Sequence, residues 1–82
     1  MKSRKEPPQF ATQRRVSEYL ENQIFYATNY GIQNRQIFVN VFNSMMAYKT
    51  AFQLTEHAEL VRMTQHAIDR LKIIAKRGGV LL

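Results

Sequence analysis

Two histidines are the side chains of this sequence with the widest range of possible chemistry. They lie nine residues apart, as His57 and His66. On one helix that spacing is a rotation of about 900°, so the two imidazoles point to opposite faces and cannot bind one metal ion together. His66 and Asp69 are three residues apart and could supply half of a metal site. Because the sequence offers them no further ligands, we expect a solvated polar helix face and no metal.

Catalytic nucleophiles have little support in this chain. There is no cysteine, and Ser3, Ser17 and Ser44 belong to no nucleophile motif. Glu56 and Glu59 form a close carboxylate pair, but acids in the first turn of a helix are commonplace and general acid–base work needs a pocket as well. No glycine-rich phosphate loop is present. The sequence therefore predicts a protein that is not an enzyme, with no cofactor and no small-molecule substrate.

Basic side chains are concentrated at the two ends of the chain. The net charge is +6, distributed as +4 over residues 1–15, −2 over residues 16–61 and +4 over residues 62–82. Such a layout suits an anionic partner that both ends contact. The residues expected to contact nucleic acid are Lys2, Arg4, Lys5, Arg14, Arg15, Arg62, Arg70, Lys72, Lys76 and Arg77.

Part of this charge forms a ridge on the helix expected near the C-terminus. At 100° per residue, five side chains fall within about 80° of one another: Arg62, His66, Arg70, Ile73 and Arg77. A ridge of this kind could follow a phosphate backbone, whose neutralisation releases counterions. The alternative is an ordinary solvated helix face, which the flanking Asp69 favours. No recognition-helix motif accompanies the ridge, so we expect DNA or other nucleic acid to be bound with low sequence specificity.

The elements that must position these residues are helical. The length of 82 residues allows one domain, and few prolines and glycines favour long regular elements. We expect a basic flexible arm over residues 1–9, a single helical domain over 10–79 and a C-terminal tail over 80–82. The fold class is all-α, a small three-helix domain with a long, widely apolar central helix.

The first helix is expected to begin between Pro8 and Thr12 and to end at Gly31, because glycine accepts the left-handed conformation beyond a helix end. The second should begin near Asn34, a favourable N-cap residue. Its apolar positions cover more than one face, which predicts that this helix is the buried centre of the structure. They are Ile37, Phe38, Val39, Val41, Phe42, Met45, Met46, Ala47, Tyr48 and Phe52.

The start of the third helix is open among three alternatives. Thr55 could be its N-cap, with Glu56 and Glu59 in a first turn that the helix dipole favours. Thr64 could cap it instead, with Met63 and Ile68 forming a hydrophobic staple. A single unbroken helix from about residue 34 to 77 is the third option, and no monomer could cover it. We favour the break at Thr55 and an end at Gly78-Gly79.

A short stretch, Thr55-Glu56-His57-Ala58, resembles a segment near the end of the long central helix of one core histone. The resemblance implies a minor alternative fold in which the middle helix extends to a break at Thr64. It covers four residues, and the loop after the first helix lacks the basic strand-loop of histones. No site residue is inferred from it.

Aromatic and methionine side chains define a second candidate surface. A chain this short buries its apolar surface incompletely, which favours a homodimer or higher oligomer. The candidate interface residues are Phe25, Tyr26, Tyr30, Phe38, Phe42, Met45, Met46 and Phe52. Those on the second helix could equally be core. The alternative function is accordingly a protein–protein adaptor, small chaperone or assembly factor.

The expected location is intracellular, either cytoplasmic or in a nucleoid or nucleus. A small extracellular protein usually needs disulfides, which this chain lacks. No apolar run of seven residues follows the basic N-terminus, so a secretory signal is not expected. The most apolar window, residues 37–52, is too short and too polar to span a bilayer.

Overall fold

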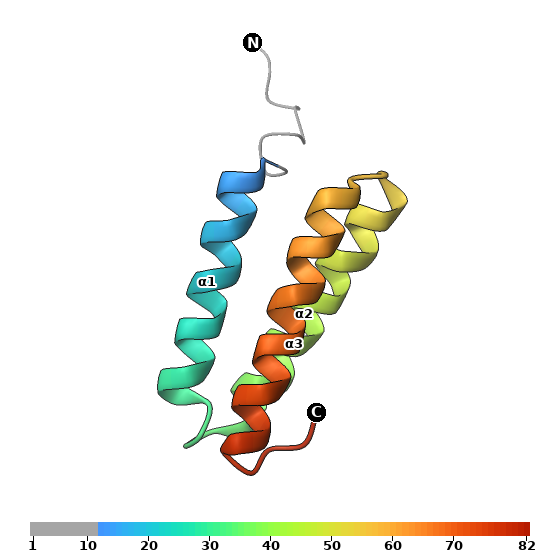
Figure 1. The fold of residues 1–82 in the computed structure, drawn as a ribbon. Helices are drawn as coiled ribbons and strands as arrows, with labels where there is room; N and C mark the ends of the chain where they lie inside the picture. The colour runs from blue at the N-terminus through green and yellow to red at the C-terminus, as the bar shows by residue number, and fades with distance from the viewer. Residues whose placement is uncertain (1–11) are drawn as a thin grey trace.

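The computed structural model describes residues 12–82, and within them the chain folds into three helices. They are α1 (Gln13–Tyr30), α2 (Arg35–Leu54) and α3 (Ala58–Arg77). These make 82% of the described residues helical, with no strand among them. In Figure 1, α1 and α3 run in the same direction, and α2, seen behind α3, runs in the opposite direction. The expected all-α, three-helix architecture is confirmed.

α1 begins and ends where the sequence predicts, but its end has a different physical basis. The hydroxyl of Thr12 accepts a hydrogen bond from the backbone N–H of Arg15, as an N-cap does. Gly31 ends the helix with φ −71°, which is not the left-handed conformation. A Cβ atom at this position would come within 2.5 Å of the Phe38 ring and 2.6 Å of the Ala27 carbonyl oxygen. Glycine is needed here for space, not for its backbone freedom.

The break between α2 and α3 lies at Thr55, as favoured, and neither alternative is realised. Asn34 caps α2 by accepting from the backbone N–H of Gln36. Thr55 is the C-cap of α2, not the N-cap of α3. Glu56 takes a positive φ of 60° in the turn, so it is not in the first turn of α3. His57 occupies the N-cap of α3 without a side-chain capping bond. A long histone-like central helix is thereby excluded.

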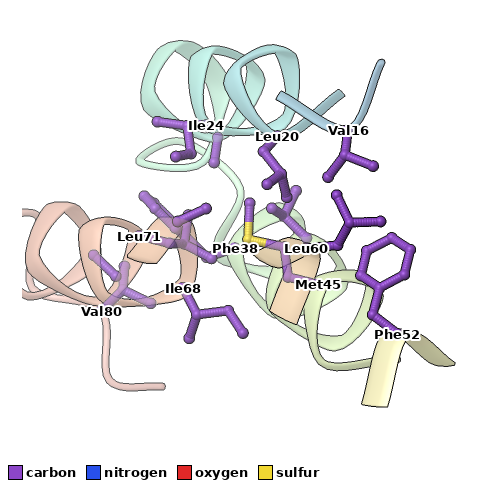
Figure 2. Packing of buried hydrophobic residues seen from close by; sticks show 14 residues of the cluster. Val16, Leu20, Ile24, Phe38, Met45, Phe52, Leu60, Ile68, Leu71 and Val80 are labelled. Carbon is purple, nitrogen blue, oxygen red and sulfur yellow. The ribbon is translucent and has the colours of Figure 1, made fainter. Parts of the chain in front are cut away.

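The core lies where the three helices face one another. In Figure 2 the side chains of Val16, Leu20 and Ile24 project from α1 toward those of α2 and α3. α3 contributes six buried residues and α2 contributes four. The prediction that the second helix is the centre of the structure is therefore wrong. Its broad apolar surface includes side chains that stay exposed, whereas the narrower stripe of α3 is buried against both neighbours.

Thr64 is buried in the middle of α3, which explains why no break occurs there. Its side chain is fully buried, and its hydroxyl donates to the carbonyl oxygen of Leu60, one turn earlier, at 2.7 Å. That bond satisfies the polar atom inside the helix, so the hydroxyl has no need of a capping position.

A Schellman turn follows α3 and places Val80, the first residue of the expected tail, in the core. Gly79 has a left-handed φ of +79°, and its N–H donates to the carbonyl of Lys76. The N–H of Val80 donates to the carbonyl of Ala75 at 2.7 Å. Val80 is buried, so the folded unit extends past residue 79. None of the three helices is long and apolar enough to cross a membrane.

Candidate nucleic-acid interface

The ridge expected on α3 lies at the edge of α3 that faces α1. Arg62, His66 and Arg70 line a groove of about 380 Å³ together with Ser17 and Glu21 of α1. The spacing of these three residues in the sequence correctly predicted that they lie on one side of α3. What the helix spacing could not show is that α1 places the carboxylate of Glu21 opposite them.

Two of the ridge arginines are engaged by carboxylates. Arg70 donates from Nη1 to Oε2 of Glu21 at 2.6 Å and from Nη2 to Oε1 at 3.4 Å, a two-bond pair that joins α3 to α1. This hydrogen bonding holds the pKa of Glu21 below its usual value. Arg62 forms an ion pair with Glu59 on the same helix. The groove is therefore close to neutral, and these two arginines already have carboxylate partners.

A different set of cations lies on the side where α3 packs against α2. The Lys72 ammonium lies 5.9 Å from the ring centroid of Phe42, and Lys49 donates from Nζ to Oε1 of Gln65 at 2.5 Å. Neither lysine belongs to an ion pair within residues 12–82. Both contacts cross the antiparallel hairpin of α2 and α3, so they fix how the two helices are aligned.

The alignment extends the cationic surface toward the open end of this hairpin. Arg35, Phe42 and Lys49 are spaced by seven residues, so they lie along one line of α2. Phe42 is opposite Lys72, and α2 and α3 are antiparallel, so Arg35 lies level with the C-terminal end of α3. Lys76 lies there too, one turn beyond Lys72. We call Arg35, Lys49, Lys72 and Lys76 the basic face.

One carboxylate accompanies the basic face, and it is partly occupied. Asp69 lies between Gln65 and Lys72 on α3, and its Oδ1 accepts a hydrogen bond from Nε2 of Gln65 at 2.9 Å. None of the ion pairs within the described residues involves a member of the basic face. Arg35, Lys72 and Lys76 are exposed, whereas Lys49 is half-buried and bonded to Gln65.

Sequence reasoning missed half of this face. Arg35 and Lys49 were counted with the acidic middle of the chain, because charge was summed along the sequence. The seven-residue spacing of Arg35, Phe42 and Lys49 was the signal that could have placed them on one line. Their proximity to Lys72 and Lys76 depends on the hairpin between α2 and α3, which no local spacing encodes.

The other basic residues predicted to contact nucleic acid are spread over different parts of the bundle. The first turn of α1 contains Arg14 and Arg15, and Arg14 pairs with Glu18 at 3.4 Å. This turn is at the opposite end of the bundle from Lys76 and Arg77. Figure 1 shows the start of α1 and the end of α3 at opposite ends. Lys2, Arg4 and Lys5 lie outside the described residues. The first turn of α1 and the last turn of α3 are thus not brought to one site within residues 12–82.

The candidate interface residues divide into exposed and buried sets. Phe25, Tyr26 and Tyr30 are 67%, 46% and 53% exposed, and the two tyrosine rings contact each other at 5.5 Å between centroids. Met46 is also exposed, and Phe42 is half-buried. Phe38, Met45 and Phe52 are buried within the single chain, so they are not available to a partner.

A second groove, which the sequence did not indicate, lies between α1 and α2. It has a volume of about 490 Å³ and is lined by Tyr19, Tyr48 and Phe52 among others. The Tyr19 and Tyr48 rings are 4.9 Å apart, and those of Tyr48 and Phe52 are 6.0 Å apart. Burial raises the pKa of Tyr19, and Tyr48 adds to the rise, whereas a hydrogen bond with Ser44 opposes it. No titration near neutral pH follows, so we assign this groove no chemistry.

Metal binding finds no support in the part of the chain that the structure describes. No group of three or more potential ligands among histidine, aspartate and glutamate comes together in residues 12–82. His66 and Asp69 accordingly have no third partner there.

Comparison with known proteins identified no relative of this chain. No protein-family model, no curated protein and no solved structure matches the chain. The class that fold and surface define is a basic three-helix bundle, with an up-down-up order of helices and a cationic face on its second hairpin.

Proposed function

We propose that this protein binds nucleic acid through the phosphate backbone and that the basic face of α2 and α3 is the contact surface. The observation that carries the proposal is that four cations without an ion pair within residues 12–82 lie along one side of the α2–α3 hairpin; Arg15 and Arg77 also have none there but lie outside the basic face. Arg14, Arg62 and Arg70 have carboxylate partners, whereas the four members of the basic face have none within residues 12–82. The net charge of +6 adds a long-range attraction to the same polyanion.

The geometry of the face suits a backbone contact better than base recognition. Arg35 and Lys49 are fourteen residues apart on α2, which is about 21 Å at 1.5 Å per residue. Lys72 and Lys76 form a second row on α3. Cations spread over such a length meet several phosphates, and phosphate contacts position a protein without reading sequence. We therefore expect duplexes of different sequence to bind with similar affinity.

The salt dependence of binding tests the proposal. With four cations on the face, the slope of log K against log salt on duplex DNA should be about −3 to −4. The measurement is fluorescence anisotropy of a labelled duplex titrated with the full chain at several salt concentrations. Absence of binding at about 50 mM salt, or binding that does not change with salt, contradicts the proposal.

A pair of double variants separates the face from the overall charge. Lys72→Glu with Lys76→Glu and Arg14→Glu with Arg62→Glu change the net charge by the same amount. The first should weaken binding about tenfold or more and reduce the steepness of the salt slope by about 2. The second, on residues that carboxylates engage, should have a much smaller effect. Equal losses in both would show that only net charge matters.

The exposed aromatics favour a second candidate function, contact with another protein chain. Phe25, Tyr26 and Tyr30 together present a large apolar area on the second half of α1. Such side chains are enriched at protein interfaces and dominate their energetics. If they bind a partner, which could be a second copy of this chain, truncating Tyr30 to alanine weakens that contact and leaves binding to DNA unchanged.

A further inference from the structure

Ser17 lies in the groove between α1 and α3, which also holds two of the ion pairs that the described residues form. Its side chain is exposed and lines the groove between α1 and α3 together with Arg62, His66 and Arg70. Arg14 is three residues before it on α1 and therefore lies on the same side of that helix. The three ion pairs within residues 12–82 all use one of these arginines: Arg14 with Glu18, Arg62 with Glu59 and Arg70 with Glu21.

The sequence before Ser17 adds a second, independent observation. It reads Arg14-Arg15-Val16-Ser17, which places two arginines three and two residues before a hydroxyl. Basic-directed protein kinases select substrates by such charge patterns, because their substrate clefts carry carboxylates at the corresponding positions. Arg15 has no ion pair within the described residues, and both arginine side chains are at the exposed start of α1.

From these two observations we propose that Ser17 is a phosphorylation site and that its phosphate is held by the surrounding arginines. The kinase transfers the γ-phosphoryl group of ATP to Oγ of Ser17. A bond forms between Oγ and phosphorus, the bond from phosphorus to the bridging β-phosphate oxygen breaks, ADP leaves, and the hydroxyl proton passes to the kinase's catalytic base. No oxidant or further co-reactant is needed.

The groove is equipped to accept the group once it is attached. A phosphoserine carries nearly two negative charges and three strong acceptor oxygens, so it competes well with a carboxylate for a guanidinium. Arg62 and Arg70 line the same groove as Ser17, where Glu59 and Glu21 hold them, and the phosphate exchanges one acceptor for another.

The main obstacle is that Ser17 is in a helix, whereas kinase clefts take an extended segment. Residues 12–17 form the start of α1, and Thr12 holds this end with one side-chain hydrogen bond. Helix ends open locally at low cost compared with whole-domain unfolding. Val16 must leave the core during that opening, so we expect phosphorylation to be slow compared with a short peptide of the same sequence.

Intact-mass and fragment mass spectrometry after incubation with ATP and a basic-directed kinase test the site. The result expected is one phosphoryl group on Ser17 of the full chain, absent from Ser17→Ala and strongly reduced in Arg14→Ala with Arg15→Ala. The variant Ser44→Ala is the matched control and should be modified like the wild type. Modification only at other residues, or none under conditions that label the peptide of residues 12–20, overturns the proposal.

A second measurement tests whether the arginines hold the phosphate. Phosphorus NMR of the phosphorylated chain follows the second ionisation of phosphoserine, whose pKa is usually about 6. The charged and titratable groups that line the groove with it are Glu21 of α1 and Glu59, Arg62, His66 and Arg70 of α3; Arg14 and Glu18 are its neighbours along α1, and α2 does not line the groove. With the arginines engaged, the pKa should be about one pH unit lower and should return toward 6 in Arg62→Ala and Arg70→Ala. An ordinary pKa that neither variant changes overturns the arginine contact. Both experiments are independent of nucleic-acid binding.

Discussion

The Arg70 guanidinium and the Glu21 carboxylate, 49 residues apart in sequence, form a two-bond ion pair that ties α3 to α1. The pair gives Arg70 a carboxylate partner inside the bundle. It also fixes the level at which the two parallel helices align. The Glu21 side chain is still 58% exposed, so solvent weakens the energetic value of the pair.

This pair predicts a small pH dependence of stability. Because the pKa of Glu21 is lowered in the fold, its contribution is present above the ordinary glutamate value of 4.5 and is lost as pH falls through the lowered value. Glu21→Gln should reduce the free energy of unfolding by about 0.5 kcal/mol at pH 7. The difference from wild type should shrink below pH 4 and vanish at still lower pH, as urea titrations at each pH would show. A constant difference across this range contradicts the assignment.

Two glycines should respond to alanine for different reasons. At Gly31 the new Cβ meets the Phe38 ring and the Ala27 carbonyl, so Gly31→Ala should destabilise the protein by about 1–3 kcal/mol through overpacking. At Gly79 nothing lies within 4 Å, and the cost of Gly79→Ala comes from the positive φ, about 1–2 kcal/mol. Replacing Phe38 with leucine should relieve part of the loss in the first variant, because the contact with the Ala27 carbonyl remains, and none of the loss in the second. Relief of both, or of neither, in chemical denaturation would refute the distinction.

The central role of α3 predicts a large effect at Leu71. This side chain is fully buried between α1 and α2, and Leu71→Ala should cost about 2–5 kcal/mol. Leu54, at the end of α2, is 79% exposed, and Leu54→Ala should change stability by no more than about 0.5 kcal/mol. Denaturant titrations of the two variants compare the same chemical change at a buried and an exposed site. Similar losses would mean that α3 is not the buried centre.

Self-association can be measured directly on the full chain. If the exposed aromatics of α1 join two copies, light scattering should give twice the chain mass of 9.7 kDa at micromolar concentration. Phe25→Ala with Tyr30→Ala should then return the monomer mass without loss of helical circular dichroism, because both side chains are exposed. A monomer mass for the unaltered chain rejects this interface and leaves the basic face unaffected.

The sequence determined most of the helix boundaries, because caps and breakers act locally. Thr12, Asn34 and Gly79 mark helix ends through hydrogen bonds or backbone conformations that depend on a few neighbouring residues. Helical spacing likewise put Arg62, His66 and Arg70 on one side of α3. Composition and periodicity were sufficient for the all-α fold, since each helix carries its own apolar stripe.

Only the tertiary structure decided which helix is central and which charges are free. The broad apolar surface of α2 suggested that it is the central helix. Burial, however, requires a neighbour on each side, and it is α3 that packs against both α1 and α2. Glu21 approaches Arg70 only because α1 and α3 run parallel, and Lys49 lies on the same surface as Lys72 only because α2 and α3 are antiparallel. Electrostatic interactions act over distances in space, so charges far apart in the sequence cannot be paired until the chain has folded.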